Sequence, residues 1–253
     1  MNLVKTSLSF LALAVMPSTV QADEWSFQIE PYAMASTIEG DTSLGRVPNV
    51  DVDVNFDTIL ENLENAAMLH FEAHHTSGWG MAFDYAFMDL GGTTANDNGS
   101  RVKADIRQGV LEGFAVHRSQ INNGHIDVIA GARWWDNDIE LNINASPTES
   151  NFDREMKSDW IDAIVGIRVQ QKLSDNWTFQ AHADVGGFGI GSSSDFTASL
   201  QAGLLYNIND MMTLDLKYKA TWVDFDEGSK GQPGYFQYDT VTHGPIIGLA
   251  FKF

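Results

Sequence analysis

A histidine-rich segment, His70-Phe-Glu72-Ala-His74-His75, holds the residue types of a zinc site. On a β-strand, the side chains of His70, Glu72 and His74 point to one side, and imidazole and carboxylate groups are ordinary zinc ligands. Alternate side chains along a strand are about 6.8 Å apart, which is wide for three ligands of one ion. These residues are therefore metal candidates, although their spacing favours polar packing inside the fold.

A second cation candidate is the segment Asp51-Val-Asp53-Val-Asn55-Phe-Asp57, in which polar residues alternate as in a calcium-binding loop. An EF-hand requires glycine at its sixth position and glutamate at its twelfth, where this segment has phenylalanine and asparagine. Asp51, Asp53 and Asp57 are thus candidates for loose binding of divalent cations by a loop.

Groups suited to nucleophilic catalysis are scattered. Serines 192–194 and Asp195 lie at a predicted strand end, and His243 lies within a later strand. His243 shares the parity of apolar residues beside Pro245, which predicts a local irregularity there, away from a polar site. Because no nucleophile, base and orienting group can be assembled from this spacing, we predict no catalytic residues, no cofactor and no enzymatic activity.

The remaining ionisable residues follow the period of two that is typical of β-strands. In the segment 177–185, five apolar side chains fall on one face and four polar ones on the other. The predicted polar face carries the following acids and bases: Glu30, Glu72, Asp84, Asp127, Arg133, Asp162, Arg168, Asp184, Asp215, Lys217 and Lys219. In a narrow barrel these side chains would meet in the lumen as ion pairs, because unpaired buried charge is costly. A polar path for small solutes and an enzymatic cluster are the alternatives.

The fold class predicted from this alternation is all-β, a transmembrane antiparallel up-and-down β-barrel of about ten strands, with about eight as the alternative. The predicted strands are 24–38, 66–76, 78–90, 104–118, 124–143, 159–173, 176–189, 195–207, 211–225 and 235–253. Short turns alternate with longer acidic or Gly/Ser/Asn-rich connections at 39–65, 91–103, 144–158 and 226–234. Strands of this length, ended by aromatic residues and joined in this way, are typical of outer-membrane barrels.

Two local irregularities are expected. The segment 56–63 has the apolar spacing of a helix, which predicts a short helix in the first long loop with Asn55 or Asp57 as its N-cap. The strand 104–118 loses its alternation around Glu112, which predicts a β-bulge there.

The first 22 residues read as a cleaved secretory signal peptide. Lys5 precedes an apolar run from Leu8 to Met16, and a Val-Gln-Ala cleavage site ends at Ala22. The predicted mature chain, 23–253, is a single barrel domain whose formal charge moves from −19 to −20 when Lys5 is removed. Such acidity argues against nucleic-acid binding, and the absence of cysteine excludes disulfides and thiolate metal sites.

The end of the chain, Gly248-Leu-Ala-Phe251-Lys-Phe253, resembles the C-terminal insertion signal of outer-membrane barrels. Three further stretches, 131–136, 184–191 and 243–248, resemble a broad family of largely uncharacterised proteobacterial outer-membrane β-barrel proteins. The resemblance covers most of the mature chain and implies one barrel in the outer membrane of a Gram-negative bacterium. It implies contact with lipid, lipopolysaccharide and the barrel-assembly machinery, and it brings no catalytic residues.

The leading functional interpretation is a porin-like outer-membrane barrel that is structural or weakly permeable to small solutes, with a charged and plugged lumen. The alternative is a surface-binding or adhesion protein that acts through acidic extracellular loops, and a lipid- or peptide-modifying barrel enzyme ranks third.

Overall fold

The computed structural model describes residues 24–45, 47–95, 101–144 and 152–253. The predicted signal peptide, residues 1–22, therefore lies outside the described residues. The elements are β1 (Trp25–Met34), β2 (Thr37–Leu44), β3 (Val47–Val54), α1 (Phe56–Asn62), β4 (Leu63–His75), β5 (Trp79–Ala95), β6 (Arg101–Ile121), β7 (Gly124–Asn144), β8 (Phe152–Lys172), β9 (Trp177–Gly187), β10 (Phe196–Asn207), β11 (Met212–Glu227) and β12 (Phe236–Lys252). No described helix is long and apolar enough to cross a membrane.

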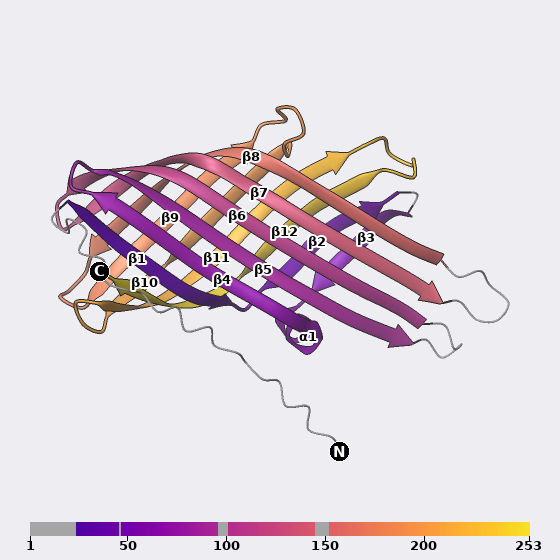
Figure 1. The fold of residues 1–253 in the computed structure, drawn as a ribbon, viewed down its shortest axis with the longest axis horizontal. Coiled ribbons are helices and arrows are strands. Elements are labelled where there is room, and N and C mark those ends of the chain that lie inside the picture. The colour runs from indigo at the N-terminus through magenta and orange to yellow at the C-terminus, as the bar shows by residue number, and fades with distance from the viewer. Residues whose placement is uncertain (1–23, 46, 96–100, 145–151) are drawn as a thin grey trace, which may run out of the picture.

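Ten of these strands form a closed antiparallel barrel, as predicted. Strands β4 to β12 pair in chain order, and β1 closes the ring by pairing with both β4 and β12. Short turns join the strands at the end that holds the C-terminus, which we call the turn end, and the longer connections lie mainly toward the opposite, loop end (Figure 1).

The connection predicted at 39–65 is wrong as a loop, because most of it is regular structure. Strand β2 continues the barrel wall along the outer part of β12, from Thr37↔His243 to Leu44↔Phe236, and β3 folds back on β2. The helix α1 follows as predicted, and Asn55 is its N-cap, since its side chain accepts a hydrogen bond from Thr58 N at 3.0 Å.

The barrel has an apolar outer face. Outward-facing side chains such as Trp79, Val128 and Ile161 are 58–60 % exposed, which a water-soluble sheet would avoid. On β7, β8 and β11 this apolar run ends toward the loop end at Trp134, Ile161 and Trp222, and the next outward residue on each strand is an aspartate. The apolar face is therefore a bounded belt, as a lipid-facing surface requires.

The strands extend past this belt, and there the two sides of the barrel pack against each other. Trp135 and Trp160 from β7 and β8 meet apolar side chains of β11 and β12, and we call the group the aromatic core; it consists of Trp135, Trp160, Val223, Phe225, Phe236 and Tyr238. A second apolar group joins β2 and α1 to β5 through Ile38, Ile59, Met88 and Leu90. Apolar side chains from different strands therefore meet in two clusters toward the loop end.

The bulge predicted at Glu112 is wrong. Strand β6 keeps continuous register with β5 and β7, and Glu112 pairs with Asp84 on one side and Arg133 on the other. Its neighbours Val110 and Phe114 face inward with it and pack in the barrel interior. The alternation of inward and outward residues is intact, and several inward-facing residues of this strand, Val110, Phe114 and Val116, are apolar.

The C-terminus closes the barrel. Phe27 and Phe253 exchange two backbone hydrogen bonds of 2.9 and 3.0 Å, and their rings stack with centroids 5.9 Å apart. Phe251 lies opposite Ile29 of β1 and Met212 of β11. Of the three residues of the predicted insertion signal, Gly248 and Phe251 therefore belong to the strand that completes the ring, and Phe253 follows directly after it, with Gly248 facing the interior.

We expect Gly248→Ala to lower the free energy of unfolding by about 1–3 kcal/mol, because an added methyl overpacks the interior. A β-carbon at this position would lie 2.4 Å from Glu30 Oε1, so the carboxylate must move. Chemical denaturation of the refolded barrel measures the loss. Gly234→Ala, where a β-carbon meets no atom within 4 Å, is the matched control. If Glu30→Ala does not relieve the Gly248→Ala defect, the close contact is not its cause.

Candidate functional site

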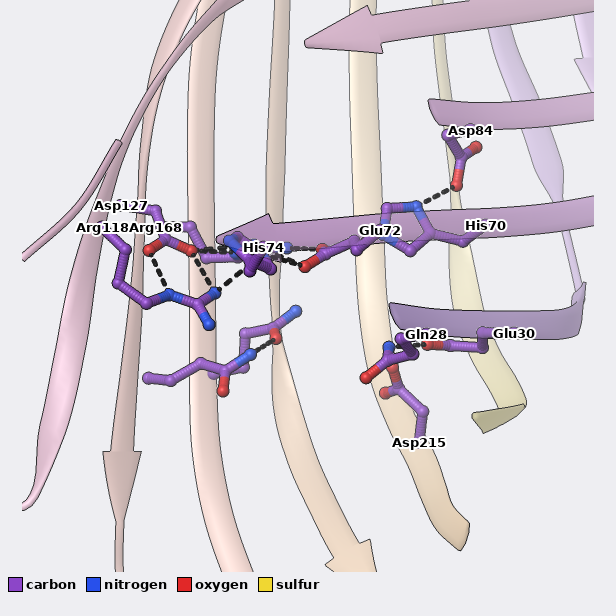
Figure 2. Close-up of polar contacts among 12 residues, drawn as sticks. Gln28, Glu30, His70, Glu72, His74, Asp84, Arg118, Asp127, Arg168 and Asp215 are labelled. Carbon is purple, nitrogen blue, oxygen red and sulfur yellow. Dashed lines mark hydrogen bonds and ion pairs between the residues drawn. The ribbon is translucent and has the colours of Figure 1, made fainter. Parts of the chain in front are cut away.

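The site predicted from the sequence is the lumen, where two clusters of charged side chains lie at different levels along the barrel. The turn-end cluster is built around Glu72 on β4 (Figure 2). Arg168 on β8 donates to both carboxylate oxygens of Glu72, with a distance of 3.0 Å from Nη2 to Oε2. His70 Nε2 and His74 Nε2 lie 2.9 and 2.8 Å from the same two oxygens. One carboxylate thus serves three cationic or imidazole groups.

A second carboxylate, Asp127 on β7, joins two arginines. Arg118 donates from Nε and Nη2 to its two oxygens at 2.8 and 2.9 Å, and Arg168 donates from Nε and Nη2 at 3.0 and 2.8 Å. Asp127 is fully buried, so it depends on this pairing. The chain of contacts continues through His70 Nδ1 to Asp84 at 3.0 Å, and Tyr32 Oη donates to Asp84 at 2.8 Å.

The mid-barrel cluster is built around Arg133 on β7, which is fully buried. Its guanidinium donates to Glu112 Oε1 at 2.5 Å, to Asp184 Oδ1 at 3.0 Å and to Thr197 Oγ1 at 3.0 Å. His182 Nε2 lies 2.8 Å from the other oxygen of Asp184. Lys219 Nζ lies 3.9 Å from Glu112, so this cluster also spans the lumen from β6 to β11.

Asp162 lies deeper toward the loop end and uses neutral donors. The indole nitrogens of Trp135 and Trp160 donate to its Oδ2 at 3.0 and 3.3 Å. Ser194 donates from its backbone N to Oδ1 at 2.7 Å and from its hydroxyl to Oδ2 at 2.9 Å. The carboxylate therefore ties the aromatic core to the segment between β9 and β10.

A third group of charges lies on β1 and β11. Lys217 forms an ion pair with Asp215, and Gln28 donates to Glu30 Oε2 at 3.3 Å. Figure 2 shows Glu30 and Asp215 facing one another near the turn-end cluster.

Between these groups lies a cavity of about 520 Å³ that extends from the turn end, where Asp210 and Phe253 line it, to Glu112 and Lys219 in mid-barrel. A smaller cavity of about 80 Å³ lies above it, between Arg133 and Trp135. The larger volume would hold a small polar solute, and Trp135 of the aromatic core lines the smaller one.

The metal candidates are arranged differently from a metal centre. His70, Glu72 and His74 do come together, but each imidazole nitrogen that faces Glu72 is hydrogen-bonded to it and Arg168 occupies the same carboxylate. Asp51 and Asp53 lie in β3, and Asp57 lies in α1, so they do not share one loop. Among the described residues, no group of three or more histidines and acids is arranged to hold a metal ion.

All eleven predicted lumen charges face the barrel interior, but sequence reasoning missed several of their partners. Arg118 was not singled out. It lies two residues from Val116 on the same strand, so the two side chains share a face, and this parity could have placed Arg118 in the lumen. Glu112 was assigned to a bulge, although its position opposite Arg133 makes it part of the mid-barrel cluster. His243 faces outward, as predicted, and lies 2.6 Å from Tyr218 Oη, close to the point where β12 changes partner from β1 to β2.

No protein-family model matches the chain, and no curated protein matches it. Among solved structures, the chain is similar to the outer membrane protease OmpT from Escherichia coli, with a TM-score of 0.57, 8 % sequence identity, and coverage of 92 % of this chain and 98 % of that one. It is also similar to the translocator domain of the autotransporter NalP from Neisseria meningitidis, with a TM-score of 0.48, 13 % identity, and coverage of 91 % and 88 %. The attachment protein Ail of Yersinia pestis gives a TM-score of 0.36 at 13 % identity, over 91 % and 99 % of the two chains.

The chain has the fold of an outer-membrane β-barrel. The closed ring of ten strands carries a bounded apolar belt that suits a lipid environment, and the likeness to OmpT supports the fold over nearly the whole chain. In outer-membrane barrels the short turns face the periplasm and the long hairpins project outside the cell.

Proposed function

We propose that the protein is a structural outer-membrane barrel whose lumen is plugged, so that it passes small solutes weakly or not at all. The observation that carries the proposal is the aromatic core. Trp160 is 2 % exposed, and its ring lies parallel to that of Phe225 with centroids 3.8 Å apart. The ring of Trp160 also lies 6.4 Å, between centroids, from that of Tyr238 on β12, so side chains from two sides of the barrel meet at this level, which supports an obstructed lumen.

The charge clusters support the same function. Arg133 and Arg168 each join carboxylates from two other strands, so they cross-link the wall from inside. In a conducting pore such charges would line an aqueous channel, whereas here they are buried and hydrogen-bonded to each other. The contacts of His70 and His182 are to carboxylates of these clusters, which supports a packing role in place of catalysis.

Planar-bilayer recording of the refolded protein tests the proposal. We expect few or no conductance steps from the native chain. Replacing two residues of the aromatic core, Phe225→Ala with Phe236→Ala, should produce discrete steps, because it removes two rings from the plug. The matched control is Phe83→Ala with Phe179→Ala, which makes the same chemical change on the outer face. Native conductance as large as that of the core variant would overturn the proposal.

A further inference from the structure

The loop between β9 and β10 lies at a different level from the other long connections. Strands β9 and β10 have 11 and 12 residues, whereas their neighbours β8 and β11 have 21 and 16. The pairing of β8 with β9 ends at Ile164↔Gly186, so β8 continues past the loop without a partner on that side. In Figure 1 the orange loop stands out from the side of the barrel, partway along it, while the other hairpins reach its far end.

This level coincides with the outer edge of the lipid-facing belt. Gly187 is ten residues above Trp177 at the periplasmic end of β9, which is a height of about 25 Å in a barrel whose strands are tilted by about 40°. The apolar band of an outer-membrane barrel is also about 25 Å tall. The loop therefore begins where the hydrocarbon of the outer leaflet ends.

The loop carries large apolar side chains that nothing in the barrel covers. Phe188 is 54 % exposed, and Ile190 is 69 % exposed, the highest value among the large apolar side chains of the described residues. On the two strands next to the loop lie Val185 and Phe196, which are 44 % and 48 % exposed; Phe196 is paired with Asp224, at the edge of the belt on β11. The exposed apolar side chains of the loop therefore follow directly, along both strands, on exposed apolar side chains at the edge of the belt.

The backbone of the loop is fixed in an unusual shape that presents these side chains. Phe188 has a φ of 69°, a left-handed conformation that is costly for a bulky residue and persists only when its surroundings enforce it. Ser193 enforces it from within the loop, since its hydroxyl donates to Gly187 O at 2.8 Å and accepts from Ile190 N at 2.8 Å. Ser194 is fully buried and is held by Asp162 in the lumen.

We propose that the β9–β10 loop inserts Phe188 and Ile190 into the outer leaflet of the outer membrane as a lateral lipid anchor. One side of the loop is fastened to the lumen through Ser194, and the other side contacts acyl chains at the edge of the belt. Burial of the two side chains in hydrocarbon offsets the strain at Phe188, because each removes a large apolar surface from water. This inference does not depend on whether the lumen conducts.

The absence of cysteine from the chain allows a direct test with single-cysteine variants. Ile190→Cys is labelled with a nitrobenzoxadiazole fluorophore, and the protein is refolded into phosphatidylcholine vesicles. We expect lipids with brominated acyl chains to quench the label as strongly as they quench a label at Leu200→Cys, a lipid-facing position on β10. Iodide in the aqueous phase should quench it no more than it quenches the Leu200→Cys label.

The matched control is Lys230→Cys, which lies in the exposed connection between β11 and β12. Its label should respond to iodide and not to brominated lipid, which excludes insertion driven by the fluorophore alone. Heat-modifiable electrophoretic mobility establishes that all three variants are folded. If the label at Ile190→Cys responds as the label at Lys230→Cys does, the loop is exposed to water and the anchor is refuted.

Discussion

Arg133→Met is expected to destabilise the barrel by about 3–5 kcal/mol, the loss that follows when one partner of a buried ion pair is removed. Arg133 is fully buried and donates to Glu112, Asp184 and Thr197. Methionine fills much of the same space but leaves two carboxylates facing each other without their shared cation. The free energy of unfolding, measured by guanidinium titration of the refolded protein, reports the effect.

A matched control is Arg107→Met on the neighbouring strand β6. Arg107 is 49 % exposed at its side chain and lies 3.5 Å from Asp138, so its loss should change the stability by about 1 kcal/mol or less. Adding Glu112→Gln and Asp184→Asn to Arg133→Met should recover much of the lost stability, because the uncompensated charges are then gone. Equal losses for the two arginine variants would contradict the role assigned to the mid-barrel cluster.

The membrane-spanning part of the fold was predictable from sequence because lipid imposes one rule on every strand. Outward residues must be apolar and inward residues polar, so the alternation sets both the strand and its facing. The helix α1 was predictable for a similar reason, since its apolar spacing and the capping residue Asn55 agree.

The rule ends where the strands leave the belt. Strand β8 was predicted to begin at residue 159 but begins at Phe152, because Lys157 and Asp159 face outward on the same side as Ile161 and interrupt the apolar parity. The β2–β3 hairpin was missed because acids lie opposite one another in it, as Asp53 lies opposite Glu39. Its position depends on the edge that β12 offers, which is a long-range contact.

The lumen site was likewise predictable in part. Inward facing was predictable for each lumen charge from parity alone, whereas pairing depends on strands far apart in sequence. Arg168 and Glu72 are separated by 96 residues and meet only when the barrel closes. The aromatic core was missed because Trp135 follows the outward-facing Trp134, so that adjacent tryptophans point to opposite sides of one strand.

Trp160→Ala is expected to lower the free energy of unfolding by about 3–5 kcal/mol, the usual loss for truncating a buried aromatic side chain. The ring is 2 % exposed and stacks between Trp135 and Phe225, with centroid distances of 5.6 and 3.8 Å. The change also removes the indole donor that lies 2.8 Å from Ser194 Oγ and 3.3 Å from Asp162. Denaturant titration, with mobility on unheated gels as a check of folding, measures the loss.

Two further variants separate packing from hydrogen bonding. Trp160→Phe keeps most of the apolar contact and loses the donor, so a loss of about 1–3 kcal/mol is expected. Trp222→Ala makes the same tryptophan-to-alanine change on the lipid-facing side of the barrel, where the ring is 40 % exposed. It should lower the free energy of unfolding by less than Trp160→Ala does. If Trp160→Ala costs no more than Trp222→Ala, the aromatic core does not hold the two walls together, and the plug proposed for the lumen loses its main support. If Trp160→Phe costs as much as Trp160→Ala, the bond to Ser194 and Asp162 dominates over ring stacking at the loop end.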